Sequence, residues 1–134
     1  MTDSFPTDGV ILSHLLVVRD LAPAVAFYRD VLGARLEREY GGTTAVLEFA
    51  GSWILLVTEG GPTPDKPGVS LVPPSDPDRA SHEFTIRVPD CREAHRVLSG
   101  RGADFLTPPY EWGSETRCFF RDPDGNLLEI SSIA

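Results

Sequence analysis

Apolar residues recur at helical spacing in two stretches of the chain, and each stretch is followed by segments in which apolar and polar residues alternate. In the first stretch the apolar stripe consists of Leu21, Val25, Tyr28 and Leu32. This spacing is typical of a helix that buries one face, whereas alternation is typical of strands with one buried side. The chain is therefore predicted to place two helices against sheets.

The two helical stretches are copies of one plan. "RDLAPAVAFYRDVLGARL" (19–36) and "PDCREAHRVLSGRGADFL" (89–106) each begin with an aspartate after an apolar strand and end with a glycine before the next strand. Asp20 and Asp90 are predicted N-caps, because a short carboxylate can accept hydrogen bonds from the free amides of the first turn. An internal repeat of this length predicts two similar structural modules.

Three strand-like segments follow each predicted helix. In the first half they cover 35–40, 44–50 and 52–59, and in the second half 104–108, 116–122 and 126–132. Glycine turns around Gly51 and Gly125 join the last two segments of each set, and both are hairpin signals. Each half is thus expected to be a βαβββ module.

A proline-rich segment, residues 60–81, separates the halves and is predicted to be a linker or covering loop, since proline cannot continue a sheet. We predict one α+β domain over residues 1–134, with module one at 10–59 and module two at 82–132. The modules would be tandem, each with a curved mixed sheet, and together they would enclose a cleft.

Charge and composition narrow the classes of function. The 134 residues carry a formal net charge of -8, which disfavours nucleic acid and anionic membranes and suits a cationic small molecule or a metal ion. The N-terminal stretch lacks a basic region and an apolar core, so a cytoplasmic location is expected. Cys91 and Cys118 show no metal-type spacing and are expected to be free thiols.

"HLLVVRDLAPAVAFYRDVLGARL" near the start and "RDPDGNLLEI" near the end make the chain resemble the vicinal oxygen chelate superfamily, with "VPDCREAHRVLSGRGADF" in support. That superfamily includes glyoxalase I, bleomycin-resistance proteins, fosfomycin-resistance transferases and extradiol dioxygenases. The resemblance covers residues 10–132. It implies paired βαβββ modules, a cleft between them and a homodimer.

The resemblance also implies a metal site, for which the candidate ligands are His14, His82 and Glu129. Two histidines and one carboxylate would hold Fe(II), Mn(II), Ni(II) or Zn(II) and leave positions open for two substrate oxygens. Alignment of the two halves, however, pairs His14 with Phe84 and moves the expected ligand position to Ser13 and Glu83. A β-bulge near the start of each strand would be needed to turn both histidines into the cleft.

Without a metal, Glu129 and Glu83 are predicted to face the cleft together. They could act as a general base, hold a cation, or pair with Arg87 or Arg117. A small organic ligand would be bound by four further candidates, namely Trp53, Tyr110, Trp112 and Arg117.

Two functions remain open at this point. One is an enzyme of the glyoxalase or dioxygenase kind, a lyase, isomerase, transferase or dioxygenase that uses a divalent metal or a glutamate base. The other is a metal-free protein of the bleomycin-resistance kind that sequesters a small molecule in the cleft. In either case the expected partners are a small molecule and a second copy of the chain.

Overall fold

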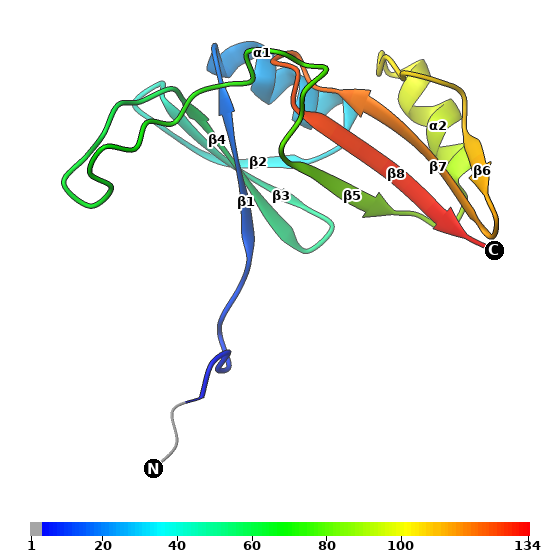
Figure 1. The fold of residues 1–134 in the computed structure, drawn as a ribbon, viewed down its shortest axis with the longest axis horizontal. Coiled ribbons are helices and arrows are strands. Elements are labelled where there is room, and N and C mark those ends of the chain that lie inside the picture. The colour runs from blue at the N-terminus through cyan, green and yellow to red at the C-terminus, as the bar shows by residue number, and fades with distance from the viewer. Residues whose placement is uncertain (1–3) are drawn as a thin grey trace.

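The computed structural model describes residues 4–134 and contains two four-stranded mixed sheets (Figure 1). Sheet 1 has the order β1-β4-β3-β2 and sheet 2 the order β5-β8-β7-β6. The elements of module one are β1 (Ser13–Val18), α1 (Leu21–Ala26), η1 (Phe27–Val31), β2 (Arg35–Tyr40), β3 (Thr44–Phe49) and β4 (Ser52–Thr58). Those of module two are β5 (Glu83–Arg87), α2 (Cys91–Gly100), β6 (Tyr110–Trp112), β7 (Glu115–Arg121) and β8 (Leu127–Ile133). The α+β fold class with tandem βαβββ modules is confirmed.

The strand registers repeat between the two sheets. In each module the first strand is parallel to the last, and the last is antiparallel to the one before it. His14 lies opposite Ile54 in sheet 1, and Phe84 lies opposite Leu128 in sheet 2, as the sequence alignment of the halves predicts. Equivalent positions can therefore be compared residue by residue.

The helices begin where the sequence predicts. The Asp20 side chain accepts from the amide of Ala22, and the Asp90 side chain accepts from the amide of Glu93 at 3.1 Å. After α1 the helix widens into the π-helical turn η1, in which the Leu32 amide donates to the Phe27 carbonyl. The apolar stripe of this helix is buried against the sheet, because its residues belong to the same core as β1, β3 and β4.

The turn at 122–126, between β7 and β8, joins module two to module one. The buried Tyr28 hydroxyl donates to Asp122 at 2.8 Å, and the Arg19 amide donates to Asp124 at 2.7 Å. Asp122 also accepts from the amides of Asp124 and Asn126, both at 2.9 Å. The aspartates of "RDPDGN" thus serve structure, since they fix the start of β8 against the first module.

The segment between β4 and β5 is held by two isolated bridges, Gly60 to Leu71 and Thr63 to Lys66. Its second half packs on the 122–126 turn, where a Cβ added to Gly125 would lie 3.2 Å from Pro77. Arg19 reaches the Pro74 carbonyl from the other side. The linker therefore also covers the junction of the modules.

One predicted strand is wrong. Residues 104–108 contain only an isolated bridge from Phe105 to Phe120, and the edge strand of sheet 2 is β6, which begins later, at Tyr110. Pro108 and Pro109 explain the shift, because proline has no amide to donate to a ladder. No helix within residues 4–134 is long and apolar enough to cross a membrane.

Candidate functional site

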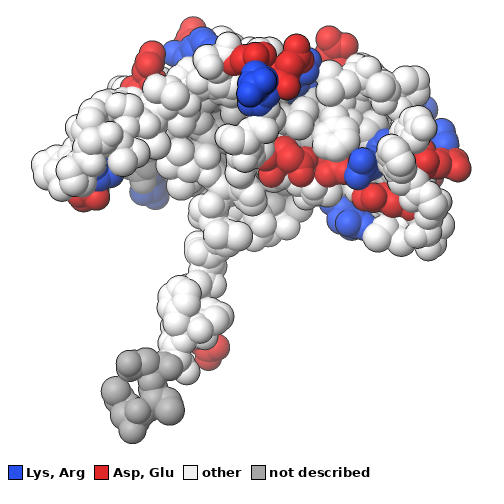
Figure 2. All heavy atoms as spheres, in the orientation of Figure 1, with Lys and Arg blue, Asp and Glu red and all other residues white. Residues whose placement is uncertain are grey.

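The face of each sheet that lies opposite its helix is called here the open face. On sheet 2 this face is polar. By strand alternation and pairing it carries Glu83, Thr85 and Arg87 from β5, Leu127, Glu129 and Ser131 from β8, Glu115, Arg117 and Phe119 from β7, and Tyr110 and Trp112 from β6. Figure 2 shows acidic and basic side chains gathered over the region of β5, β7 and β8, whereas the neighbouring region of β1 to β4 is mostly neutral.

Glu129 is the most deeply placed charge on this face, with 6% of its surface exposed. The Thr85 hydroxyl donates to Glu129 at 2.6 Å and lies 3.2 Å from a carboxylate oxygen of Glu83. A hydroxyl has one proton, so it can satisfy only one of these carboxylates at a time. The second oxygen of Glu83 is buried and has no hydrogen-bond partner among residues 4–134. The arrangement therefore lacks one donor.

Burial raises the pKa of Glu83, and the nearby negative charge of Glu129 raises it further. Both effects act in the same direction, since removing water and adding a like charge each disfavour ionisation. A carboxyl group with a raised pKa can hold a proton for its neighbour or accept one from a bound molecule. Glu83 is thus the group of this site that is suited to proton exchange.

Arg117 is a cation that lies beside Glu129. Its Nε lies 3.9 Å from Glu129, and one of its terminal nitrogens lies 3.8 Å from Glu115, so both ion pairs are long. Glu115 in turn accepts a 2.6 Å hydrogen bond from Ser131. The guanidinium also lies 5.5 Å from the Trp112 ring and 5.6 Å from the Phe119 ring. Arg117 thus lies near two carboxylates and forms a close ion pair with neither.

Tyr110 and Trp112 lie at the outer edge of the same face, with their ring centroids 5.2 Å apart. Together with Arg117 and Phe119 they line a shallow depression of about 180 Å³. The structure therefore brings three of the predicted ligand-binding residues together. The fourth, Trp53, lies on sheet 1, opposite Ser13 of β1.

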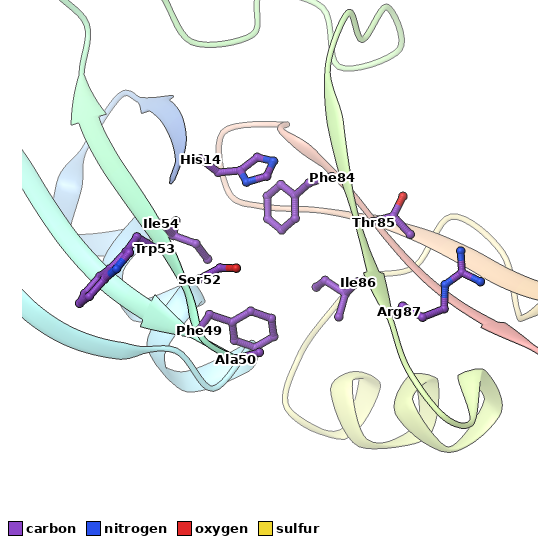
Figure 3. A pocket seen from close by; sticks show the side chains of 10 residues that line it. All are labelled: His14, Phe49, Ala50, Ser52, Trp53, Ile54, Phe84, Thr85, Ile86 and Arg87. Atoms are coloured by element: carbon purple, nitrogen blue, oxygen red, sulfur yellow. The ribbon is translucent and has the colours of Figure 1, made fainter. Parts of the chain in front are cut away.

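A cavity of about 230 Å³ lies between the modules (Figure 3). The side chains of His14, Phe84 and Ile86 point into it, whereas Trp53 and Arg87 point away to either side. The His14 ring lies 5.0 Å from the Phe84 ring and 5.8 Å from the His82 ring. This cavity is mostly apolar. Thr85 lines it and also contacts Glu83 and Glu129 through its hydroxyl.

The three predicted metal ligands do not share one site within the chain. His14 has the same strand parity as Leu16 and Val18, on the helix side of β1, while Glu129 lies on the open face of sheet 2 and is held by Thr85. Within residues 4–134, no three His, Cys, Asp or Glu side chains come together as a metal-binding group. A divalent metal therefore does not fit this donor set as the single chain presents it.

Two contacts of the site were missed by sequence reasoning. Glu115, which accepts from Ser131 and faces Arg117, belongs to the alternation of 115–121, so its parity with Arg117 was the available signal. The role of Thr85 as a donor between the two glutamates had no such signal, because it depends on the parallel register of β5 and β8.

Comparison with known proteins places the chain in a family. Residues 11–130 match the family model of the glyoxalase/bleomycin resistance protein/dioxygenase superfamily, and the chain belongs to it. A search of curated proteins found no match.

Solved structures with the same fold are numerous. A glyoxalase/bleomycin resistance protein/dioxygenase from Nocardioides is 25% identical, with a TM-score of 0.75, over 98% of this chain and 86% of that one. Lactoylglutathione lyase from Agrobacterium tumefaciens is 20% identical, with a TM-score of 0.71, over 95% of each chain. A fosfomycin resistance protein, FosX, from Listeria monocytogenes, complexed with Mn(II) and 1S,2S-dihydroxypropylphosphonic acid, is 21% identical, with a TM-score of 0.66, over 89% of this chain and 86% of that one. Such neighbours show the fold.

Proposed function

We propose that this protein binds a small organic molecule without a metal, and that Glu83 and Glu129 hold a cationic or hydrogen-bond-donating group of that molecule. The observation that carries the proposal is a buried oxygen of Glu83 that has no hydrogen-bond partner among residues 4–134. The other Glu83 oxygen lies 3.2 Å from the Thr85 hydroxyl, which donates to Glu129. An unsatisfied buried acceptor costs free energy, and a donor from a ligand would remove that cost. An ammonium or amidinium group supplies both the donor and the opposite charge.

The surroundings support an organic rather than an inorganic cation. Tyr110, Trp112 and Phe119 offer aromatic surface beside the carboxylates, and Trp112 is 57% exposed. Aromatic walls with a few charged groups are the usual composition of small-molecule sites. The net charge of -8 adds a long-range attraction for a cationic ligand.

We further propose that the protein works as a homodimer in the cytoplasm. Support for the dimer comes from the apolar residues that one chain leaves exposed on β1, its N-terminal extension and β2, chiefly Leu12, Leu15 and Tyr40. Burial of such surface against a second copy would lower its hydration free energy.

A second candidate is an enzyme in which Glu83 is the general base. The raised pKa of Glu83 favours it, since a base works best when its pKa approaches the working pH. Ionised Glu83 would accept a proton from a carbon acid or a hydroxyl of the substrate. Thr85 would keep Glu129 in place and so preserve the local charge.

The metal-dependent lyase, isomerase, transferase or dioxygenase is the third candidate. Glu129 would be a ligand with His14 and His82, and a bound metal would act as a Lewis acid on adjacent substrate oxygens. Because those three side chains do not form one group in the chain, we derive no reaction step from a metal.

The binding proposal is tested by fluorescence. Trp112, which lies beside Arg117 and Phe119, reports binding. The probes are matched aromatic ligands that carry an ammonium, a hydroxyl or a carboxylate. The ammonium compound is expected to bind most tightly. Its affinity should fall by about tenfold or more in Glu129→Gln, which corresponds to the loss of one charge-assisted contact of about 1.4 kcal/mol.

The matched control is Glu93→Gln, because Glu93 is an exposed carboxylate on α2 whose partner is Arg96. This variant should bind like the wild type. Equal binding of the ammonium and carboxylate probes would overturn the proposal. Stoichiometric metal in protein purified without chelator, lost in Glu129→Gln, would favour the third candidate instead.

A further inference from the structure

Cys91 and Cys118 are the only cysteines of the chain, and the fold places their sulfur atoms 3.8 Å apart. Cys91 lies in the first turn of α2, and Cys118 lies in the middle of β7, on the face of sheet 2 that the helix covers. Each residue is 1% exposed. Two thiols that are 27 residues apart in sequence thus meet between a helix and a strand.

The two sulfurs are in van der Waals contact and are not bonded. A disulfide requires a separation of about 2.05 Å, so the sulfurs must approach by roughly 1.8 Å. The start of α2 is also tied to β8, because the Cys91 amide donates to Ser132 at 3.1 Å and the Cys91 thiol lies 3.7 Å from the Ile130 carbonyl. A movement of this first turn towards β7 would supply the approach.

We propose that Cys91 and Cys118 form a redox modification site, which closes into an intramolecular disulfide when a low-molecular-weight disulfide is the oxidant. The Cys91 thiolate attacks one sulfur of the oxidant and forms a mixed disulfide, and one small thiolate leaves. The Cys118 thiolate then attacks the Cys91 sulfur and releases the second small thiol. Two protein sulfurs lose two electrons in total, and the oxidant gains them as two thiols.

Cys91 is the entry thiol because it lies at the end of an element. Burial raises the pKa of both thiols, and that of Cys118 reaches about 12, with the neighbouring Cys91 as a further cause. Reaction therefore requires local opening of the first turn of α2, which exposes Cys91 and restores its ionisation. The site is expected to react slowly, at a rate set by that opening.

The bond would link α2 to the sheet that carries the candidate binding site. Cys118 is adjacent in β7 to Phe119, and Phe119 lies opposite Glu129 in β8. Closing a loop of this length restricts the unfolded chain and stabilises the folded one. Oxidation should therefore stabilise module two without adding any group to the open face.

The experiment incubates the whole protein with oxidised glutathione until the thiol content no longer changes, then alkylates any free thiol in denaturant and measures the mass. The expected product has lost two hydrogens and carries neither an alkyl group nor a glutathione adduct. Its Tm should be about 4 °C or more above that of the reduced protein, and a dithiol reductant should reverse the change.

The control variants are Cys118→Ala and Cys91→Ala, each checked by circular dichroism for folding. The first should stop at the mixed disulfide on Cys91, and the second should remain unmodified in native buffer. The wild-type reaction is repeated in mild urea, which is intended to open the first turn of α2. This separates poor access of the oxidant to Cys91 from an unfavourable Cys91–Cys118 disulfide. Two free thiols under both conditions, or disulfide-linked dimers as the product, would overturn the proposal.

Discussion

The open faces of the two sheets have the same backbone and opposite chemistry. Leu15 lies opposite Leu55 in sheet 1, and at the equivalent place in sheet 2 Thr85 lies opposite Glu129. The first pair is apolar and half-exposed or exposed, whereas the second is a hydrogen-bonded hydroxyl and carboxylate. The duplicated module therefore sets the positions of these side chains, and the residue types alone decide which sheet is suited to a charged ligand.

The β-hairpin turns of the two modules also occupy equivalent positions and differ in their polar residues. The module-one turn contains Ala50 and Gly51, both at positive φ, and a Cβ added to Gly51 would meet no atom within 4 Å. The module-two turn is bound to module one by Tyr28 and Arg19 through its aspartates. Its buried polar residues hold the modules together, so the second turn contributes more to stability than the first.

The largest effect is expected from Asp122→Ala, which leaves the Tyr28 hydroxyl, the Asn126 amide group and two backbone amides without their acceptor. We expect the free energy of unfolding in urea to fall by about 3 kcal/mol, because several buried donors lose their partner. Tyr28→Phe removes only one of these bonds and should cost about 1 kcal/mol. Equal costs for the two variants would contradict the proposed role of the turn.

The next largest effect tests whether a buried glutamate is tolerated only at the Glu129 position of module two or also at the equivalent position of module one. Leu55→Glu puts the module-two acid at the equivalent position of module one, beside Leu15 and without a hydroxyl donor. We expect a loss of about 2 kcal/mol at pH 7, recovered on acidification as the new carboxyl group is protonated. The reciprocal Glu129→Leu should stay within about 1 kcal/mol of the wild type, because it removes a buried charge together with its desolvation cost. A larger loss in Glu129→Leu than in Leu55→Glu would show that the acid is required for folding.

A pH titration sharpens the comparison further. The pKa of Glu83 is raised in the folded protein, so over the range from its ordinary value of 4.5 up to the raised value the folded state binds more protons than the unfolded state. Stability contributed by Glu83 is then greatest at low pH and declines as pH rises through that range. Glu129→Gln should lower the pKa of Glu83 towards its ordinary value, as read from carboxyl chemical shifts by NMR. The pKa of Asp122 is also raised, chiefly by burial, and acts in the same direction, so the difference between wild type and Glu83→Gln isolates the first group.

The smallest effects concern the turn glycines. Ala50 has a φ of +50°, which glycine adopts at lower cost, so Ala50→Gly should stabilise the protein by about 0.5 kcal/mol in thermal unfolding. Gly125→Ala should act in the opposite sense by about 1 kcal/mol, since its φ is +92° and the added Cβ would meet Pro77. If both variants were neutral, the two turns would not differ as described.

Much of the fold and some of the site could be predicted. The alternation in β5 and β8 correctly predicted that Glu83 and Glu129 share one face of sheet 2. The alignment of the two halves correctly predicted that His14 lies on the other face of its own strand. The edge strand was placed too early, because Phe105 and Leu106 have strand character and only Pro108 and Pro109 argue for a break. The alternation of apolar and polar residues predicted the structure correctly where one face of a strand is buried.

The amino-acid sequence alone determined the repeated module, its helix starts and the parity of its strands, because these depend on interactions between residues close together in the chain. Tertiary structure decided which distant groups meet: Thr85 with Glu129, Tyr28 with Asp122, and Cys91 with Cys118. Each of these contacts depends on strand register or on module packing, and these are settled by the burial of the whole core rather than by any local pattern.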